Sequence, residues 1–149
     1  MANGNLLIID DEVVLLKRLK KCLESYADEI YLAVDGLEGL KVLETHKVNC
    51  IICDIKMPKM NGLEFIKQLR TQNDNTPLIF FTGHGNRELM LEAIKYGAFD
   101  FLDKPKLDGL EEVVSRGMTE GFERKTLAQE SEEEIMNAYA KLMKEIDND

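Results

Sequence analysis

The sequence predicts an α/β protein in which five parallel strands form one sheet with helices on both faces. Over the first 106 residues, short apolar runs alternate with segments whose apolar residues recur at helical spacing. The runs are nearly continuous in apolar residues, as expected for strands buried on both faces. Several of them end in a carboxylate, a hydroxyl or a lysine, which places polar groups at the edge where open α/β sheets bind ligands. Right-handed crossovers restrict the topology without fixing the strand order.

Each element is predicted from its own pattern of apolar and turn residues. The apolar runs predict strands at 6–10, 30–34, 48–54, 78–82 and 99–102. Helical spacing predicts a helix over 12–26 and helices around 37–43, 63–69 and 89–94. Asp35-Gly36 should break the chain before the second helix, and Gly97 should stop the fourth.

The C-terminal part of the sequence predicts more helix. Apolar residues between 110 and 122 indicate a fifth helix that closes the sheet, although Gly117 and Gly121 each weaken it by roughly 1 kcal/mol relative to alanine and put its continuity in doubt. The acidic run 130–134 is typical of a helix start, with Ser131 as its candidate cap. We therefore expect a domain over 1–122 and an acidic amphipathic helical tail over 123–149.

The tail carries apolar residues at a spacing of i, i+4, i+7 and i+11: Ile135, Tyr139, Leu142 and Ile146. Such a narrow line is typical of helix pairing. Three interpretations are open: the tail pairs with a second copy, it docks on the surface of the fourth helix, or it caps its own domain.

Composition excludes several classes of protein. A net charge of −9 in 149 residues argues against general binding to nucleic acid or to an anionic membrane surface. The sequence has no run of about 18 apolar residues and no basic, signal-like N-terminus. Cys50 and Cys53 form a CxxC pattern, but they lie in a predicted strand where they face opposite sides, so we expect buried free thiols and a reducing cytoplasm.

Five residues at predicted strand ends suggest the chemistry: Asp10, Asp11, Asp54, Thr82 and Lys104. Three clustered carboxylates repel one another unless a cation lies among them, and an all-oxygen site suits Mg²⁺. The lysine and the hydroxyl then require an anionic ligand, for which a phosphoryl group is the obvious candidate.

In this order, these motifs resemble the CheY-like receiver domain of two-component response regulators. The matching pieces are the acidic pair after the first strand, Asp54 in Asp-Ile-Lys-Met-Pro, the Asn61-Gly62 pair, Thr82-Gly83 and Lys104-Pro105. The resemblance covers about residues 5–122. It implies a flavodoxin-like, doubly wound sheet with the strand order 2-1-3-4-5.

The resemblance also implies a role for each acidic residue. Asp54 would be the phosphoacceptor, which takes a phosphoryl group from a histidine kinase or a histidine phosphotransfer protein. Asp11 would bind Mg²⁺ directly and Asp10 mostly through water. Asp54 and the backbone carbonyl of Lys56 would complete the protein's share of the metal ligands.

The remaining site residues would serve binding and switching. Lys104, whose bond to Pro105 is usually cis in this family, would hold a phosphoryl oxygen. Thr82 would donate its hydroxyl to the phosphoryl group, and Phe101 would move inward with it, although a phenylalanine there is as readily explained as core. Lys56 and His84 stand where the family tunes the loss of the phosphoryl group; ordinary polar surface is the competing interpretation of His84.

We therefore expect a single-domain response regulator: a phosphorylation switch rather than an enzyme, which assists its own phosphorylation and dephosphorylation. Its downstream partner is not indicated by the sequence, and a homodimer through the fourth helix or the C-terminal helix is open. The alternative is a metal-dependent phosphatase with an aspartyl-phosphate intermediate, but residue 56 is a lysine where a general acid would be needed. A flavin-binding module is disfavoured because Asp10-Asp11-Glu12 would repel a phosphate.

Overall fold

The computed structural model describes residues 4–147. Its elements, in chain order, are β1 (Asn5–Ile9), α1 (Val13–Leu23), the 3₁₀ turn η1 (Glu24–Tyr26), β2 (Glu29–Ala33), α2 (Gly36–Thr45), β3 (Cys50–Cys53), α3 (Gly62–Thr71), β4 (Leu78–Thr82), α4 (Arg87–Lys95), β5 (Asp100–Asp103) and α5 (Leu110–Asp147). All strand pairs are parallel, in the order β2-β1-β3-β4-β5. The predicted fold class and strand order are confirmed.

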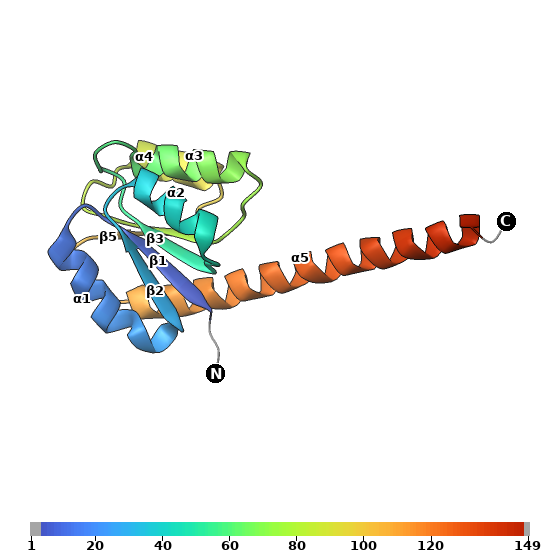
Figure 1. Ribbon diagram of the computed structural model, residues 1–149. Coiled ribbons are helices and arrows are strands. Elements are labelled where there is room, and N and C mark those ends of the chain that lie inside the picture. Colours follow the sequence, from blue (N-terminus) through green and yellow to red (C-terminus); the bar gives the residue numbers. More distant parts are fainter. Residues whose placement is uncertain (1–3, 148–149) are drawn as a thin grey trace.

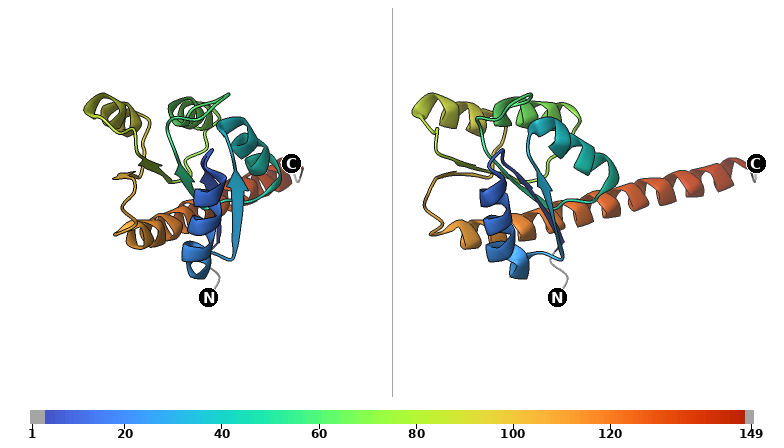
Figure 2. Two further views of the ribbon diagram at one scale, coloured as in Figure 1. Left: turned by 90° about the vertical axis from the view of Figure 1, so that its left-hand side faces the viewer. Right: turned by 60° about the vertical axis from the view of Figure 1, so that its left-hand side comes forward.

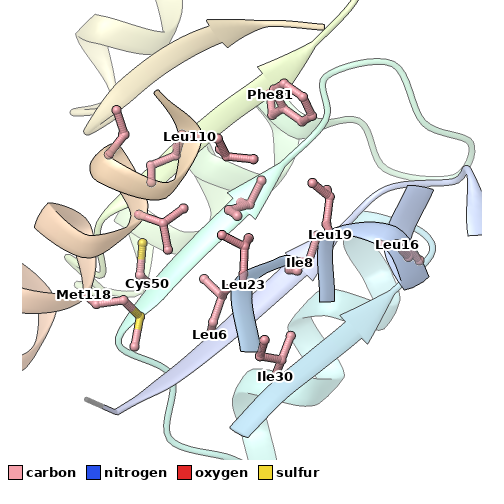
Figure 3. Close-up of a cluster of buried hydrophobic side chains, with 14 residues drawn as sticks. Leu6, Ile8, Leu16, Leu19, Leu23, Ile30, Cys50, Phe81, Leu110 and Met118 are labelled. Carbon is pink, nitrogen blue, oxygen red and sulfur yellow. The ribbon is translucent and has the colours of Figure 1, made fainter. Parts of the chain in front are cut away.

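Two layers of helix enclose the sheet. In Figures 1 and 2, α1 and α5 cover one face, and α2, α3 and α4 cover the other. Alternate residues of each strand feed two separate cores: Leu6 and Ile8 of β1 pack under α1 and α5, and Leu7 and Ile9 pack on the opposite side. Figure 3 shows the first of these cores.

The cysteines follow the same alternation. Cys50 belongs to the core under α1 and α5, whereas Cys53 belongs to the opposite core. Both are free and buried, and Cys22 is free and exposed. The CxxC pattern is therefore a consequence of strand packing, as predicted.

Short polar side chains define where the helices begin. Asp35, Asn61 and Asn86 cap α2, α3 and α4 by accepting hydrogen bonds from the backbone N–H groups of Glu38, Glu64 and Leu89, respectively, at 2.8–2.9 Å. Gly97 follows α4 with a φ of 72°, a left-handed conformation that suits glycine. Most element boundaries lie close to the predicted ones. The first helix is an exception, because α1 ends at Leu23 and the 3₁₀ turn η1 follows it.

The structure corrects two expectations about the C-terminal helix. First, α5 continues unbroken through Gly117 and Gly121. These glycines let α5 lie close to β3: a Cβ at Gly117 would lie 2.8 Å from Cys50 Sγ, and one at Gly121 would overlap the carbonyl oxygen of Asn49. Close packing therefore outweighs their low helix propensity.

Second, the acidic run 130–134 is in the interior of α5, so it starts no helix and Ser131 caps none. The tail is a continuation of α5 that projects beyond the domain (Figure 1). Its last fixed contacts with the domain include Arg124, which donates to the carbonyl of Asn75 at 2.7 Å, and Lys125, which donates to the carbonyl of Val48. The apolar residues beyond them are exposed, so the tail does not cap its own domain.

Among residues 4–147, no helix is both long enough and apolar enough to cross a membrane.

Candidate functional site

Three carboxylates meet at the carboxyl ends of β1 and β3. Asp10 and Asp54 continue these strands: the N–H of Asp10 donates to the carbonyl of Ala33, and that of Asp54 to the carbonyl of Ile9, both at 3.0 Å. Asp10 is 2% exposed and Asp54 is 3% exposed, whereas Asp11 is exposed. One carboxylate oxygen of each lies within 4.8 Å of the others. The parallel sheet therefore gathers residues that are far apart in the sequence.

Lys104 reaches this cluster from the chain just after β5. Its Nζ lies 2.7 Å from Asp10 Oδ2 and 3.0 Å from Asp54 Oδ2, so one ammonium bridges the two buried carboxylates. The Lys104–Pro105 peptide bond is cis, as the resemblance implied. The backbone N–H of Lys104 donates to the carbonyl of Thr82 at 2.9 Å, which joins the ends of β4 and β5.

The cluster formed by Asp10, Asp54 and Lys104 carries an excess of negative charge. Burial raises the pKa of Asp10 above its usual value of 3.8, even though the hydrogen bond from Lys104 acts in the opposite direction. For Lys104, burial acts to lower the pKa, but the hydrogen bonds to Asp10 and Asp54 outweigh it and raise the pKa overall. One lysine therefore attracts both carboxylates without neutralising the cluster.

The donor set fits a hard divalent cation. Each buried carboxylate gives one oxygen to a backbone N–H and the other to Lys104: Asp10 Oδ1 accepts from Glu12 N at 2.9 Å, and Asp54 Oδ1 accepts from Ile55 N at 2.7 Å. These bonds orient the carboxylates while a further lone pair on each oxygen remains available. Asp10, Asp11 and Asp54 are thus suited to Mg²⁺, while a contribution from the carbonyl of Lys56 stays a prediction.

Thr82 and Phe101 lie on the same side of the sheet. Thr82 ends β4 and is fully buried, and its Oγ1 accepts a hydrogen bond from the backbone N–H of His84 at 3.1 Å. The ring of Phe101 is partly buried and lies 6.0 Å from that of Phe80, centroid to centroid. Gly85 approaches it closely, since a Cβ there would lie 2.8 Å from Phe101 Cε1. The roles predicted for Thr82, Phe101 and the exposed Lys56 and His84 stay predictions.

Two contacts near the site were not predicted from the sequence. Glu12 Oε1 lies 3.6 Å from Lys104 Nζ, and its position directly after Asp10-Asp11 was the available signal. Gly62 lies so close to the end of β3 that a Cβ would overlap the carbonyl oxygen of Asp54. The Asn61-Gly62 pair is one of the motifs that carry the resemblance, but this close approach has no signature in the sequence.

Comparison with known proteins decides the family. Residues 6–115 match the response regulator receiver domain family. The chain belongs to this family. The family match agrees with receiver signalling and does not favour the phosphatase alternative.

Individual relatives support the assignment. This receiver domain is 34% identical over 102 residues to the transcriptional regulatory protein FixJ of Bradyrhizobium diazoefficiens, covering 68% of this chain and 50% of FixJ. It is 34% identical over 105 residues to the aerobic respiration control protein ArcA of Escherichia coli K12, covering 70% of this chain and 44% of ArcA. The aligned part of the chain thus spans about half the length of these relatives.

Solved structures of receiver domains have the same fold as this chain. The signal receiver domain of a putative LuxO repressor protein from Vibrio parahaemolyticus superposes with a TM-score of 0.77 at 26% identity, covering 83% of this chain and 96% of that one. A CheY-like receiver domain protein from Methanospirillum hungatei gives 0.75 at 27% identity, covering 81% and 98%, respectively.

Proposed function

We propose that this receiver domain accepts a phosphoryl group on Asp54 from a phosphohistidine of a histidine kinase or phosphotransfer protein. The observation that carries the proposal is the bridge of Lys104 between the buried carboxylates of Asp10 and Asp54, at 2.7 and 3.0 Å. A lysine held in this position is ready to bind a phosphoryl oxygen once Asp54 is phosphorylated. The family match supports the same chemistry.

The transfer is a single displacement at phosphorus. A carboxylate oxygen of Asp54 forms the new P–O bond while the P–N bond to the donor imidazole breaks, and the electron pair of that bond returns to the imidazole nitrogen. The protein's task is to align the acceptor and to offset charge on the phosphoryl oxygens. The hydrogen bond from Ile55 N fixes Asp54 Oδ1, and Lys104 supplies a positive charge. Mg²⁺ bound by Asp10, Asp11 and Asp54 would supply the rest of the charge neutralisation.

The switch would use Thr82 and Phe101. A phosphoryl group on Asp54 would offer an acceptor to the O–H of Thr82, and rotation of the hydroxyl toward it would draw Oγ1 away from the N–H of His84, whose hydrogen bond Oγ1 now accepts. Movement of the 82–86 loop would change the packing of Gly85 on Phe101 and thereby the surface of α4 and β5. That surface would be presented to a downstream protein.

The proposal is tested by labelling the chain with acetyl phosphate and Mg²⁺. The wild-type protein should gain one phosphoryl group, and hydroxylamine should remove it, because it is an acyl phosphate. Asp54→Asn should gain none. Asp108→Asn, which changes an exposed aspartate in the loop before α5, is the matched control and should label as the wild type does. Undiminished labelling of Asp54→Asn would refute the assignment.

A further inference from the structure

One face of α5 runs uninterrupted from the domain into the tail. Within the domain, Leu110, Val114, Gly117 and Gly121 of this face are buried against the sheet. Further steps of three or four residues lead along the tail through these positions: Lys125, Ala128, Glu132, Ile135, Tyr139, Leu142 and Ile146. Leu110 and Ile146 are 36 residues apart, which is about ten helical turns, so both ends face the same way. We call the part from Ala128 to Ile146 the seam.

Nothing within residues 4–147 covers the seam. Ile135, Tyr139, Leu142 and Ile146 are 67%, 59%, 53% and 57% exposed, and Met136 and Met143 beside them are 65% and 41% exposed. The overhang from residue 127 to 147 is roughly 30 Å long at about 1.5 Å per residue. A stripe of this kind on an unsupported helix marks a protein-binding surface.

We propose that the tails of two copies of this chain pair antiparallel through the seam. The position of the domain sets the orientation. Because the domain lies on the seam side of α5, two chains paired in parallel through the seam would bring both domains to the same place. An antiparallel pair separates them to opposite ends, since the tail projects freely away from the domain (Figure 2).

The charges along the tail favour the same orientation. Glu132 is on the seam, and a parallel pair in register would set it beside Glu132 of the second copy. Four glutamates lie between 130 and 134, whereas the lysines of the tail beyond residue 126 are Lys141 and Lys144. Antiparallel pairing brings the acidic half of each tail beside the half that carries the lysines. The tail is therefore complementary to itself, as a twofold interface requires.

A groove receives the end of the partner helix. It lies where the tail leaves the domain and is lined on the seam side by Gly121, Lys125, Ala128 and Glu132. Lys47 and Arg124 also line it and add positive charge. In an antiparallel pair, the C-terminal turn of the second copy, with Glu145, Asp147 and the negative end of its helix dipole, approaches this groove.

The pairing is independent of phosphorylation, and cysteine cross-linking of the full chain tests it. The background is Cys22→Ser, because Cys50 and Cys53 are buried. Light scattering should give a dimer. In antiparallel tails that pair with Ala128 opposite Ile146, the register that sets the lysines beside the glutamates, the two copies of Ile146→Cys are more than about 25 Å apart, too far for a disulfide.

Ile146→Cys alone should therefore stay reduced, while its mixture with Ala128→Cys, one chain tagged, should give a mixed disulfide. Asn137→Cys, on the outward face of the same helix, is the control and should not cross-link. A monomer by light scattering, a self-disulfide of Ile146→Cys, or equal cross-linking of Asn137→Cys would overturn the proposal. So would a dimer that survives Ile135→Asp with Leu142→Asp. Acetyl phosphate labelling of each variant shows separately whether the domain is folded.

Discussion

At the scale of single residues, the site is built around a shortage of positive charge. Lys104 is shared by Asp10 and Asp54, and Glu12 approaches it from the start of α1. The two buried carboxylates are held in place by backbone N–H groups, so they cannot turn out to water when no cation is present. The site is thus arranged to bind a cation, and this arrangement lowers the free energy of unfolding of the domain without that cation.

This arrangement predicts a pH-dependent gain in stability from Asp10→Asn without Mg²⁺. The pKa of Asp10 is raised in the folded protein, so its favourable contribution is complete below the unfolded value of 3.8 and is lost as the pH rises through the folded value. At neutral pH, the buried carboxylate therefore lowers stability. The variant should be more stable in urea unfolding at neutral pH, by on the order of 1 kcal/mol.

The gain should shrink as the pH falls through the raised pKa of Asp10, where the wild-type carboxyl takes up its proton. Asp11→Asn is the control, because Asp11 is exposed and its neutralisation should change the free energy of unfolding much less. A gain that is the same at both pH values would contradict the explanation. In the presence of Mg²⁺, we expect both variants to lose part of the stabilisation that the cation gives to the wild type.

At the scale of elements, α5 depends on glycines that a helix would normally avoid. Gly117 brings the helix to Cys50, and Gly121 brings it to the backbone just before β3. Arg124 and Lys125 then bind carbonyl groups of the segments that lead into β4 and β3. One end of the sheet thus holds α5 in place before it projects beyond the domain.

Gly121→Ala should accordingly destabilise the domain, even though alanine favours helix by about 1 kcal/mol. The added Cβ would overlap the carbonyl oxygen of Asn49, and moving α5 away should cost about 1–3 kcal/mol, as overpacking typically does. Urea unfolding measures the change. Asn137→Ala, in the exposed part of the same helix, should be neutral or slightly stabilising; equal effects of the two variants would exclude the close-packing explanation.

The comparison between sequence and structure is most informative for this helix. Strands β1, β3 and β4 were predictable because nearly every residue in them is apolar, and the carboxylates because each follows a strand end. The continuity of α5 was not predictable, because the contacts of Gly121 and Lys125 are with residues more than seventy positions earlier. The acidic run 130–134 is equally compatible with a helix start and with an exposed helix interior. The ion pair of Glu12 depends on the fold of the β5–α5 connection and leaves no local pattern.

At the scale of the whole molecule, the site and the tail lie at opposite ends of the strands of the sheet. The carboxylates follow the carboxyl ends of β1 and β3, whereas Arg124 and Lys125 contact the chain just before β4 and β3. Figure 1 shows the tail leaving the domain at this second end. Chemistry at Asp54 and association through the tail should therefore be separable.

The double variant Ile135→Asp with Leu142→Asp should label at Asp54 at the same initial rate as the wild type. Its self-association should be lost, because two charges would enter the seam. Incorporation of a phosphoryl group from acetyl phosphate, measured with light scattering on the same samples, gives both results. Asn137→Asp is the matched control on the outward face and should change neither. A large loss of labelling in the double variant would mean that the two ends are coupled.

The continuity of α5 makes the tail a lever arm. Because no loop separates the buried part of the helix from its overhang, any tilt of α5 on the sheet is carried to the distal end without loss. With an arm of roughly 30 Å, a tilt of about 5° would displace that end by nearly 3 Å. A shift too small to alter the core could thus be transmitted to whatever holds the far end of the helix.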